Sequence, residues 1–132
     1  MISLEVAALY CAAGLVWLLA LAFAVVRRRM QARISLGDGA DEVLLRLIRT
    51  HGNAVEWLPP GLIGLLALAA LPATPVWLVH ACGAALLLGR ILHGLALSGN
   101  AGPSAGRTLG IALSATSYLF LACGLIWSAL IA

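Results

Sequence analysis

Long runs of apolar residues alternate with short polar segments along the chain. The first run, 6–26, holds 21 residues without a charged side chain, and the last, 109–132, holds 24. About 20 apolar residues cross a bilayer as a helix, so each of these runs is long enough for one membrane span. Two shorter runs, 57–71 and 76–89, reach that length only by including ionisable residues. The pattern predicts four helices, near 3–29, 42–71, 75–98 and 105–131.

The composition excludes the soluble classes of protein. Hydrophobic residues make up 63% of the 132 residues and charged residues 10%, whereas a soluble domain has about 45–50% and about 25%. This excludes an ordinary soluble enzyme and a nucleic-acid-binding domain. We therefore expect one membrane domain over 1–132, an all-α integral membrane four-helix bundle. The three cysteines stand alone inside apolar runs, so we expect neither a disulfide framework nor a metal site.

The basic residues, all of them arginines, are distributed unevenly. Four lie in the connection 27–41 and one in the connection 98–107, whereas the turn at 72–75 has none. Cytoplasmic loops of membrane proteins are enriched in arginine and lysine. We therefore expect both arginine-containing connections in the cytoplasm and both termini outside.

The second predicted helix has one polar face. At about 100° per residue, its polar residues fall within an arc of about 100°. They are Arg46, Arg49, Asn53, Glu56 and Trp57. His51 points to nearly the opposite side and would meet a different neighbour.

Two opposite charges are expected at the same depth on consecutive helices. Glu56 and Arg90 each lie about 22 Å from the same outer face, at a rise of about 1.5 Å per residue. A lone charge in hydrocarbon is costly, so charges inside spans face the bundle interior and pair. We therefore expect a Glu56–Arg90 ion pair, with His93 on the same face as Arg90. Such a pair is functional or only sets the register of the two helices.

The cations exceed what one structural ion pair needs. Six polar residues converge toward the cytoplasmic end: Arg46, Arg49, Asn53, Arg90, His93 and Arg107. A basic pocket with one carboxylate and one amide suits a small, flexible anion that also has an ammonium group. Glutathione, with two carboxylates, an amine and a thiol, fits that description.

The motifs resemble those of a known family. They are Arg46-x-x-Arg49-x-His51-x-Asn53-x-x-Glu56-x-x-Pro59 and, in the third span, Gly89-Arg90-x-x-His93. This pattern is similar to that of the MAPEG family, the membrane-associated proteins in eicosanoid and glutathione metabolism. The resemblance covers nearly the whole chain. It implies a homotrimer of four-helix protomers, with glutathione as cosubstrate bound between neighbouring subunits near the cytoplasmic face.

The resemblance also implies roles for single residues. Arg49, Asn53 and Glu56 would contact glutathione, and His51 would reach it from the adjacent subunit's side. Arg107 matches the arginine that stabilises the thiolate, and Thr108 stands where the family's prostaglandin synthase has a serine assisting the thiol. The chain departs from several members in having Trp57 and Leu97 where they have tyrosines.

These observations favour a glutathione-dependent membrane transferase or peroxidase. It would activate the thiol as thiolate for attack on a lipophilic small molecule that enters from the bilayer. Two alternatives stay open: a small proton-coupled multidrug exporter and a catalytically silent membrane scaffold. An exporter of that class is expected to have its glutamate in the first span and few buried cations, unlike this chain. The expected partners are further copies of the chain, the lipid bilayer and the lipophilic substrate, and no nucleic acid.

Overall fold

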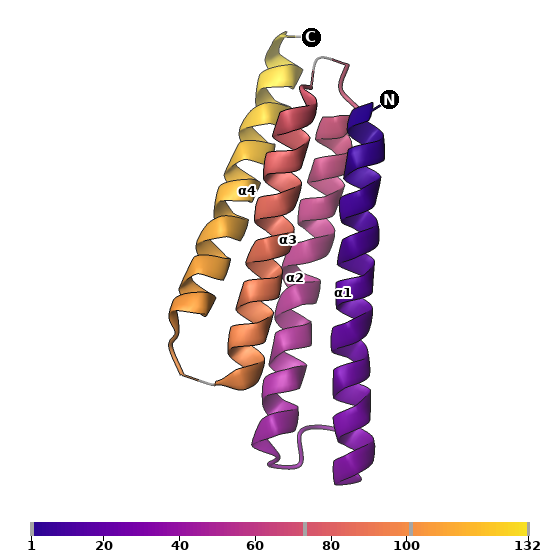
Figure 1. Cartoon of the computed structure of the whole chain (residues 1–132), viewed down its shortest axis with the longest axis vertical. Coiled ribbons are helices and arrows are strands. Elements are labelled where there is room, and N and C mark those ends of the chain that lie inside the picture. Colours follow the sequence, from indigo (N-terminus) through magenta and orange to yellow (C-terminus); the bar gives the residue numbers. More distant parts are fainter. Residues whose placement is uncertain (1, 73, 101, 132) are drawn as a thin grey trace.

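The computed structural model describes residues 2–72, 74–100 and 102–131, which form four long helices (Figure 1). They are α1 (Ile2–Ala32), α2 (Glu42–Ala69), α3 (Val76–Gly99) and α4 (Ala105–Ile131). Each begins and ends within one turn of its predicted position, so the all-α four-helix prediction is confirmed. The beginning of α1, the end of α4 and the α2–α3 connection lie at one end of the bundle. The two arginine-containing connections lie at the other end (Figure 1). This agrees with the expectation that both lie on the same side of the membrane.

The helices α2 and α3 form the centre of the bundle. They contact each other, and each contacts both α1 and α4. Within the described residues α1 and α4 do not contact each other, and they lie at opposite edges in Figure 1. The apolar core lies along one face of α2, where Leu58, Leu62 and Leu65 pack against the other helices. Most large apolar side chains of α1 point outward.

Three of the four helices are long and apolar enough to cross a membrane by length and composition alone: α1, α3 and α4. The helix α2 is the exception among the described helices, and it contains Arg46, Arg49 and Glu56 along its length. The chain is therefore a membrane protein with three helices that can span the bilayer by length and composition, and the crossing of α2 stays a prediction.

An ion pair joins the end of α1 to the beginning of α2. The helix α1 ends where Arg33 adopts a left-handed backbone conformation with φ 56°. Asp41 is the N-cap of α2, because its carboxylate accepts a hydrogen bond of 2.7 Å from the Leu44 N–H. The same carboxylate pairs with the guanidinium of Arg28, whose Nε lies 3.2 Å from Oδ1. This pair holds the pKa of the Asp41 carboxyl below its usual value.

The Asp41 pair predicts a pH dependence of stability. Because the folded pKa is lowered, the pair stabilises the fold above the ordinary carboxyl pKa, and this contribution is lost as pH falls through the folded value. We expect Asp41→Asn, which keeps a good N-cap residue, to melt slightly below wild type at neutral pH. The difference in melting temperature should begin to shrink near the ordinary carboxyl pKa of about 3.9. It should disappear below the lowered pKa of the folded protein. Thermal unfolding in detergent at several pH values measures this, and a gap that does not change with pH would contradict it.

The backbones of α3 and α4 approach closely at two glycines. A Cβ atom on Gly110 would lie 2.6 Å from the Gly89 carbonyl oxygen and 2.7 Å from the His93 Cβ. A Cβ atom on Gly89 would lie 2.8 Å from the Gly110 carbonyl oxygen. Small residues commonly permit this contact between membrane helices. This close approach brings His93 on α3 and the beginning of α4 together.

We expect Gly110→Ala to destabilise the protein by about 1–3 kcal/mol, because the added methyl group overpacks a tight contact. The matched control is Gly99→Ala near the end of α3, where a Cβ atom would meet nothing within 4 Å. Alanine is a better helix former than glycine, so the control should be as stable as wild type or more so. Unfolding followed by circular dichroism in detergent compares them. Equal stability of the two variants would show that the close approach does not form.

Candidate functional site

A pocket of about 360 Å³ lies between α2, α3 and α4. Its polar lining consists of Arg46, Arg49, Asn53, His93 and Arg107. Its apolar lining consists of Leu45, Leu97 and Ile111. The structure thus brings together five of the nine candidate site residues. The lining residues come from the first half of α2, the last part of α3 and the first part of α4. These parts adjoin the two arginine-containing connections, which lie at one end of the bundle (Figure 1).

The helical repeat places the lining residues. Arg46, Arg49 and Asn53 follow at spacings of three and four, so they lie on one face of α2. His93 comes from α3, near the contact with Gly110, and Arg107 comes from the first turn of α4. Because consecutive helices run in opposite directions, the beginning of α2, the end of α3 and the beginning of α4 lie close together.

The three pocket arginines differ in how they are held. The Arg46 Nε donates to the Ser98 carbonyl at 3.3 Å, and its guanidinium lies 3.8 Å from the exposed carboxylate of Glu42. The Arg107 guanidinium donates to the Gly102 carbonyl at 2.9 Å. Arg49 is exposed and makes no hydrogen bond or ion pair with any residue that the structure describes. Its charge is therefore available to a ligand.

Arg90 lies behind the pocket wall. Only 1% of its surface is exposed. Its guanidinium donates to Asn53 Oδ1 at 2.8 Å, to Ser114 Oγ at 2.8 Å and to the Gly110 carbonyl at 3.0 Å. The Arg90 Cζ also lies 4.8 Å from the centre of the Trp57 ring, at cation–π distance. Each nitrogen of the Arg90 guanidinium thus has a neutral hydrogen-bond partner, and Arg90 supports the pocket from behind.

The predicted Glu56–Arg90 ion pair is not present. Glu56 is exposed on the surface of the chain, and it forms no ion pair within the described residues. Matching depth did not determine which side of α2 faces α3. Asn53 and Trp57 face Arg90, whereas Glu56 lies beyond the edge of that face.

Two further candidate residues lie outside this pocket. His51 is half-buried on α2 and does not line the pocket. Thr108 is exposed, and its hydroxyl donates to the Ser104 carbonyl at 3.3 Å. Within a single chain, three candidate residues are thus separate from the pocket lining: His51, Glu56 and Thr108.

Sequence reasoning missed the partners of Arg90. Ser114 and the Gly110 carbonyl complete its hydrogen bonds, and Trp57 covers it. The Trp57 carbonyl in turn accepts a hydrogen bond of 2.6 Å from the Tyr118 hydroxyl. The spacing of Gly110 and Ser114 on one face of α4 was the available signal, because small residues mark close helix contacts.

The pocket offers hydrogen-bond donors and positive charge. Three guanidinium groups and one amide line it, and none of its lining residues is an acid. Guanidinium groups bind carboxylates well because their N–H groups match the two oxygens. No group of metal-ligating side chains occurs among the described residues. The arrangement therefore suits a small organic anion.

Comparison with known proteins gives the family. Residues 7–127 match the model of the MAPEG family. The chain is 42% identical over 88 residues to the inner membrane protein YecN of Escherichia coli strain K12, and equally to YecN of strain O6:H1. The matched region covers 67% of this chain and 66% of each relative, slightly less than two thirds of their length. No solved structure matches the chain. The family model spans most of the chain and matches what its motifs indicated, so this protein belongs to the MAPEG family.

Proposed function

We propose that the protein is a glutathione-dependent transferase or peroxidase that acts on a lipophilic electrophile. The observation that carries the proposal is the pocket of three arginines, Asn53 and His93, which has no acid among its lining residues. Its volume lies in the range of pockets that hold small ligands, about 300–1,000 Å³. Glutathione brings two carboxylates for the guanidinium groups. Membership of a family that includes glutathione transferases also supports the proposed glutathione-dependent activity.

Within this proposal Arg107 activates the thiol. A free thiol has a pKa of about 8.5 and is mostly protonated at neutral pH. A neighbouring guanidinium stabilises the thiolate and donates hydrogen bonds to it without itself losing a proton. The thiolate then attacks the electrophile, forming a carbon–sulfur bond as the leaving group departs. In a peroxidase reaction it attacks the peroxide oxygen instead, which breaks the O–O bond and gives an alcohol and a glutathione sulfenic acid. The thiol of a second glutathione then attacks the sulfenic acid sulfur, forming the disulfide and releasing water.

We also propose that the working unit is a homotrimer. Glu56 lies on the protomer surface at the middle of α2, in a helix that the proposal places in the membrane. A carboxylate is costly against lipid, so such residues face protein or a water-filled cavity. A neighbouring copy would cover Glu56 and let it accept from the ligand's ammonium group. His51, outside this protomer's pocket, would serve the adjacent site.

The arrangement of the ends supports the proposed orientation. Both arginine-containing connections lie at one end of the bundle (Figure 1), and the pocket residues come from the parts of α2, α3 and α4 that adjoin these connections. With those connections in the cytoplasm, as their arginines favour, glutathione enters from the cytoplasm. The electrophile reaches the site sideways from the bilayer. The name of the Escherichia coli relative places that protein in the inner membrane.

The direct test is binding and turnover of the detergent-purified protein. We expect isothermal titration with glutathione to give saturable binding, and chlorodinitrobenzene to be conjugated to glutathione. Native mass spectrometry should give a trimer. Absence of glutathione binding would overturn the proposed function, and a stable monomer or dimer that still binds and turns over would overturn the trimer alone.

A further inference from the structure

We propose that Arg90 is a positioning residue that fixes the orientation of the Asn53 amide. Asn53 then presents only its N–H donors to the pocket. The inference rests on the proposed function of this pocket, and it names the kind of ligand atom that lies against Asn53. It also changes the part assigned to Arg90, which the motif alone would place in contact with the ligand.

The direction of the Asn53 amide follows from the chemistry of its partner. A guanidinium has donors and no acceptor, whereas a carboxamide has one acceptor oxygen and one donor NH₂ group. The hydrogen bond of 2.8 Å between Arg90 and Asn53 is therefore made by the amide oxygen. Turning the amide over would place its N–H groups against a buried cation. Hence Oδ1 faces Arg90.

Arg90 is itself held so that it cannot follow a turn of Asn53. Its Nε donates to Ser114 Oγ, and the Ser114 hydroxyl donates to the same Gly110 carbonyl that accepts from Arg90. Trp57 covers the guanidinium plane. Ser114 and Arg90 are both essentially inaccessible to solvent. The orientation of the amide is thus fixed by a buried network on α3 and α4.

The pocket side of Asn53 is consequently a donor. Asn53 lines the pocket, and none of the described residues accepts a hydrogen bond from its Nδ2. The ligand atom at this position must be an acceptor, such as a carboxylate or peptide carbonyl oxygen. An ammonium group is excluded there, because it would meet only donors. Asn53 therefore selects which part of glutathione enters this side of the pocket.

Two substitutions of Asn53 separate this selection from stability. Asn53→Asp keeps an acceptor for Arg90 but removes both donors, and it creates an ion pair with a buried cation. Asn53→Ala removes the donors without adding charge but leaves Arg90 short of one partner. We expect Asn53→Asp to melt at or above the wild-type temperature and Asn53→Ala to melt below it. Both should lose about tenfold or more in glutathione affinity by isothermal titration, as expected for a hydrogen bond to a charged group.

Two substitutions of Arg90 test the positioning itself. Arg90→Met frees the Asn53 amide to turn, so we expect glutathione affinity to fall several-fold. Arg90→Lys restores a donor to Oδ1 and should recover part of that loss. Wild-type affinity in either Asn53 variant would overturn the inference, as would equal affinities in Arg90→Met and Arg90→Lys. Absence of glutathione binding by the wild-type protein would overturn the proposed function instead, which keeps the two failures distinct.

Discussion

Replacing Arg107 with alanine should lower glutathione-dependent turnover by about 100-fold or more, an effect of the size seen when a single stabilising donor is removed from an active site. The dissociation constant of glutathione should change far less. Arg107 lies in the first turn of α4 at the edge of the pocket, opposite the arginines of α2. Those arginines suit the carboxylates of the ligand, which leaves Arg107 for the sulfur.

The pH dependence of this loss distinguishes a role at sulfur from a role in binding. Without the guanidinium, the pKa of the bound thiol rises, and less thiolate is present at neutral pH. One pKa unit corresponds to about a tenfold change in thiolate fraction. The rate deficit of Arg107→Ala should therefore shrink as pH is raised toward about 9, where more of the thiol ionises unaided. Turnover and the ultraviolet absorbance of the bound thiolate, recorded across this range, measure the effect.

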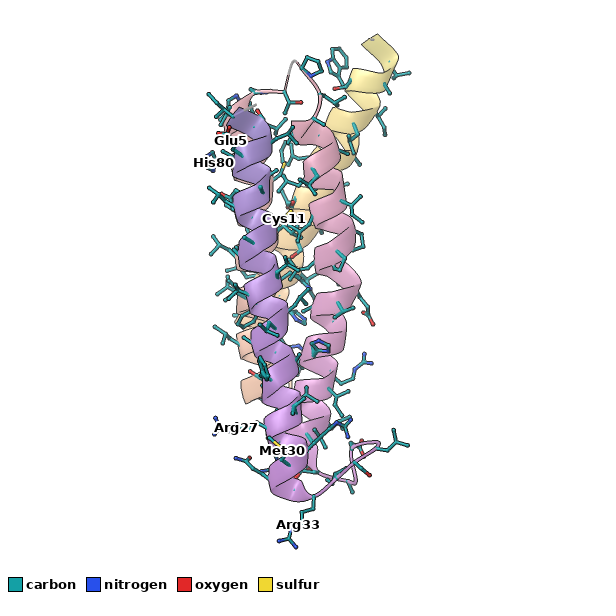
Figure 2. The ribbon with its side chains drawn as sticks, turned by 90° about the vertical axis from the view of Figure 1, so that its right-hand side faces the viewer. Glu5, Cys11, Arg27, Met30, Arg33 and His80 are labelled. Carbon is teal, nitrogen blue, oxygen red and sulfur yellow. The ribbon has the colours of Figure 1, made fainter. Side chains whose placement is uncertain are left out.

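Arg33→Ala is the matched control for Arg107→Ala. Arg33 is an exposed arginine at the end of α1, outside the lining of this pocket (Figure 2). Its removal lowers the net charge equally, so turnover and its pH profile should stay close to wild type. If Arg107→Ala leaves the thiolate absorbance and its pH midpoint unchanged, the role assigned to Arg107 is wrong.

Arg49→Gln should weaken glutathione binding by about 10- to 100-fold, the range for loss of a charge-assisted hydrogen bond. The melting temperature should not change, because Arg49 is exposed and has no partner among the described residues. At saturating glutathione, turnover should approach the wild-type rate, since the reacting sulfur is held elsewhere. Titration calorimetry and steady-state kinetics on the same preparation give both quantities.

Arg46 and Arg27 provide the comparisons for Arg49. Arg46→Gln also removes a pocket guanidinium, but it breaks the bond to the Ser98 carbonyl, so stability and affinity should fall together. Arg27→Gln removes an exposed arginine of α1 that does not line the pocket, and affinity should stay within about twofold of wild type. An affinity loss as large in Arg27→Gln as in Arg49→Gln would show that only the overall charge matters.

The helices were predictable because apolar runs of spanning length have few alternatives in a bilayer. The largest error in a boundary is at the end of α1, which continues beyond the predicted end at residue 29 to Ala32. The apolar run cannot indicate this end, because a helix can extend beyond the hydrocarbon and residues 30–32, methionine, glutamine and alanine, are all good helix formers. The end comes instead at Arg33, which turns the backbone into the left-handed region.

The pocket was less predictable than the helices. Spacing along α2 placed Arg46, Arg49 and Asn53 on one face, and the structure keeps them together. Depth alone suggested Glu56 as the partner of Arg90, but depth does not determine the angle at which two helices face each other. Neutral acceptors, not Glu56, accept the hydrogen bonds of Arg90. One of them is the backbone carbonyl of Gly110, which no side-chain pattern can reveal.

The uneven burial of the four helices affects how the chain enters a membrane during synthesis. The helix α1 is apolar along most of its length and mostly exposed, and no contact with α4 occurs between the described residues. The helix α1 can therefore leave the insertion machinery and rest in lipid before the other helices are made.

The helix α2 carries two pocket arginines and Glu56, and it is the least suited to remain in lipid alone. Arg46 and Asn53 meet their partners on α3, Ser98 and Arg90, only after that helix has been synthesised. We therefore expect the integration of α2 into the membrane to depend on the arrival of α3, so that residues of the pocket also influence the order of assembly.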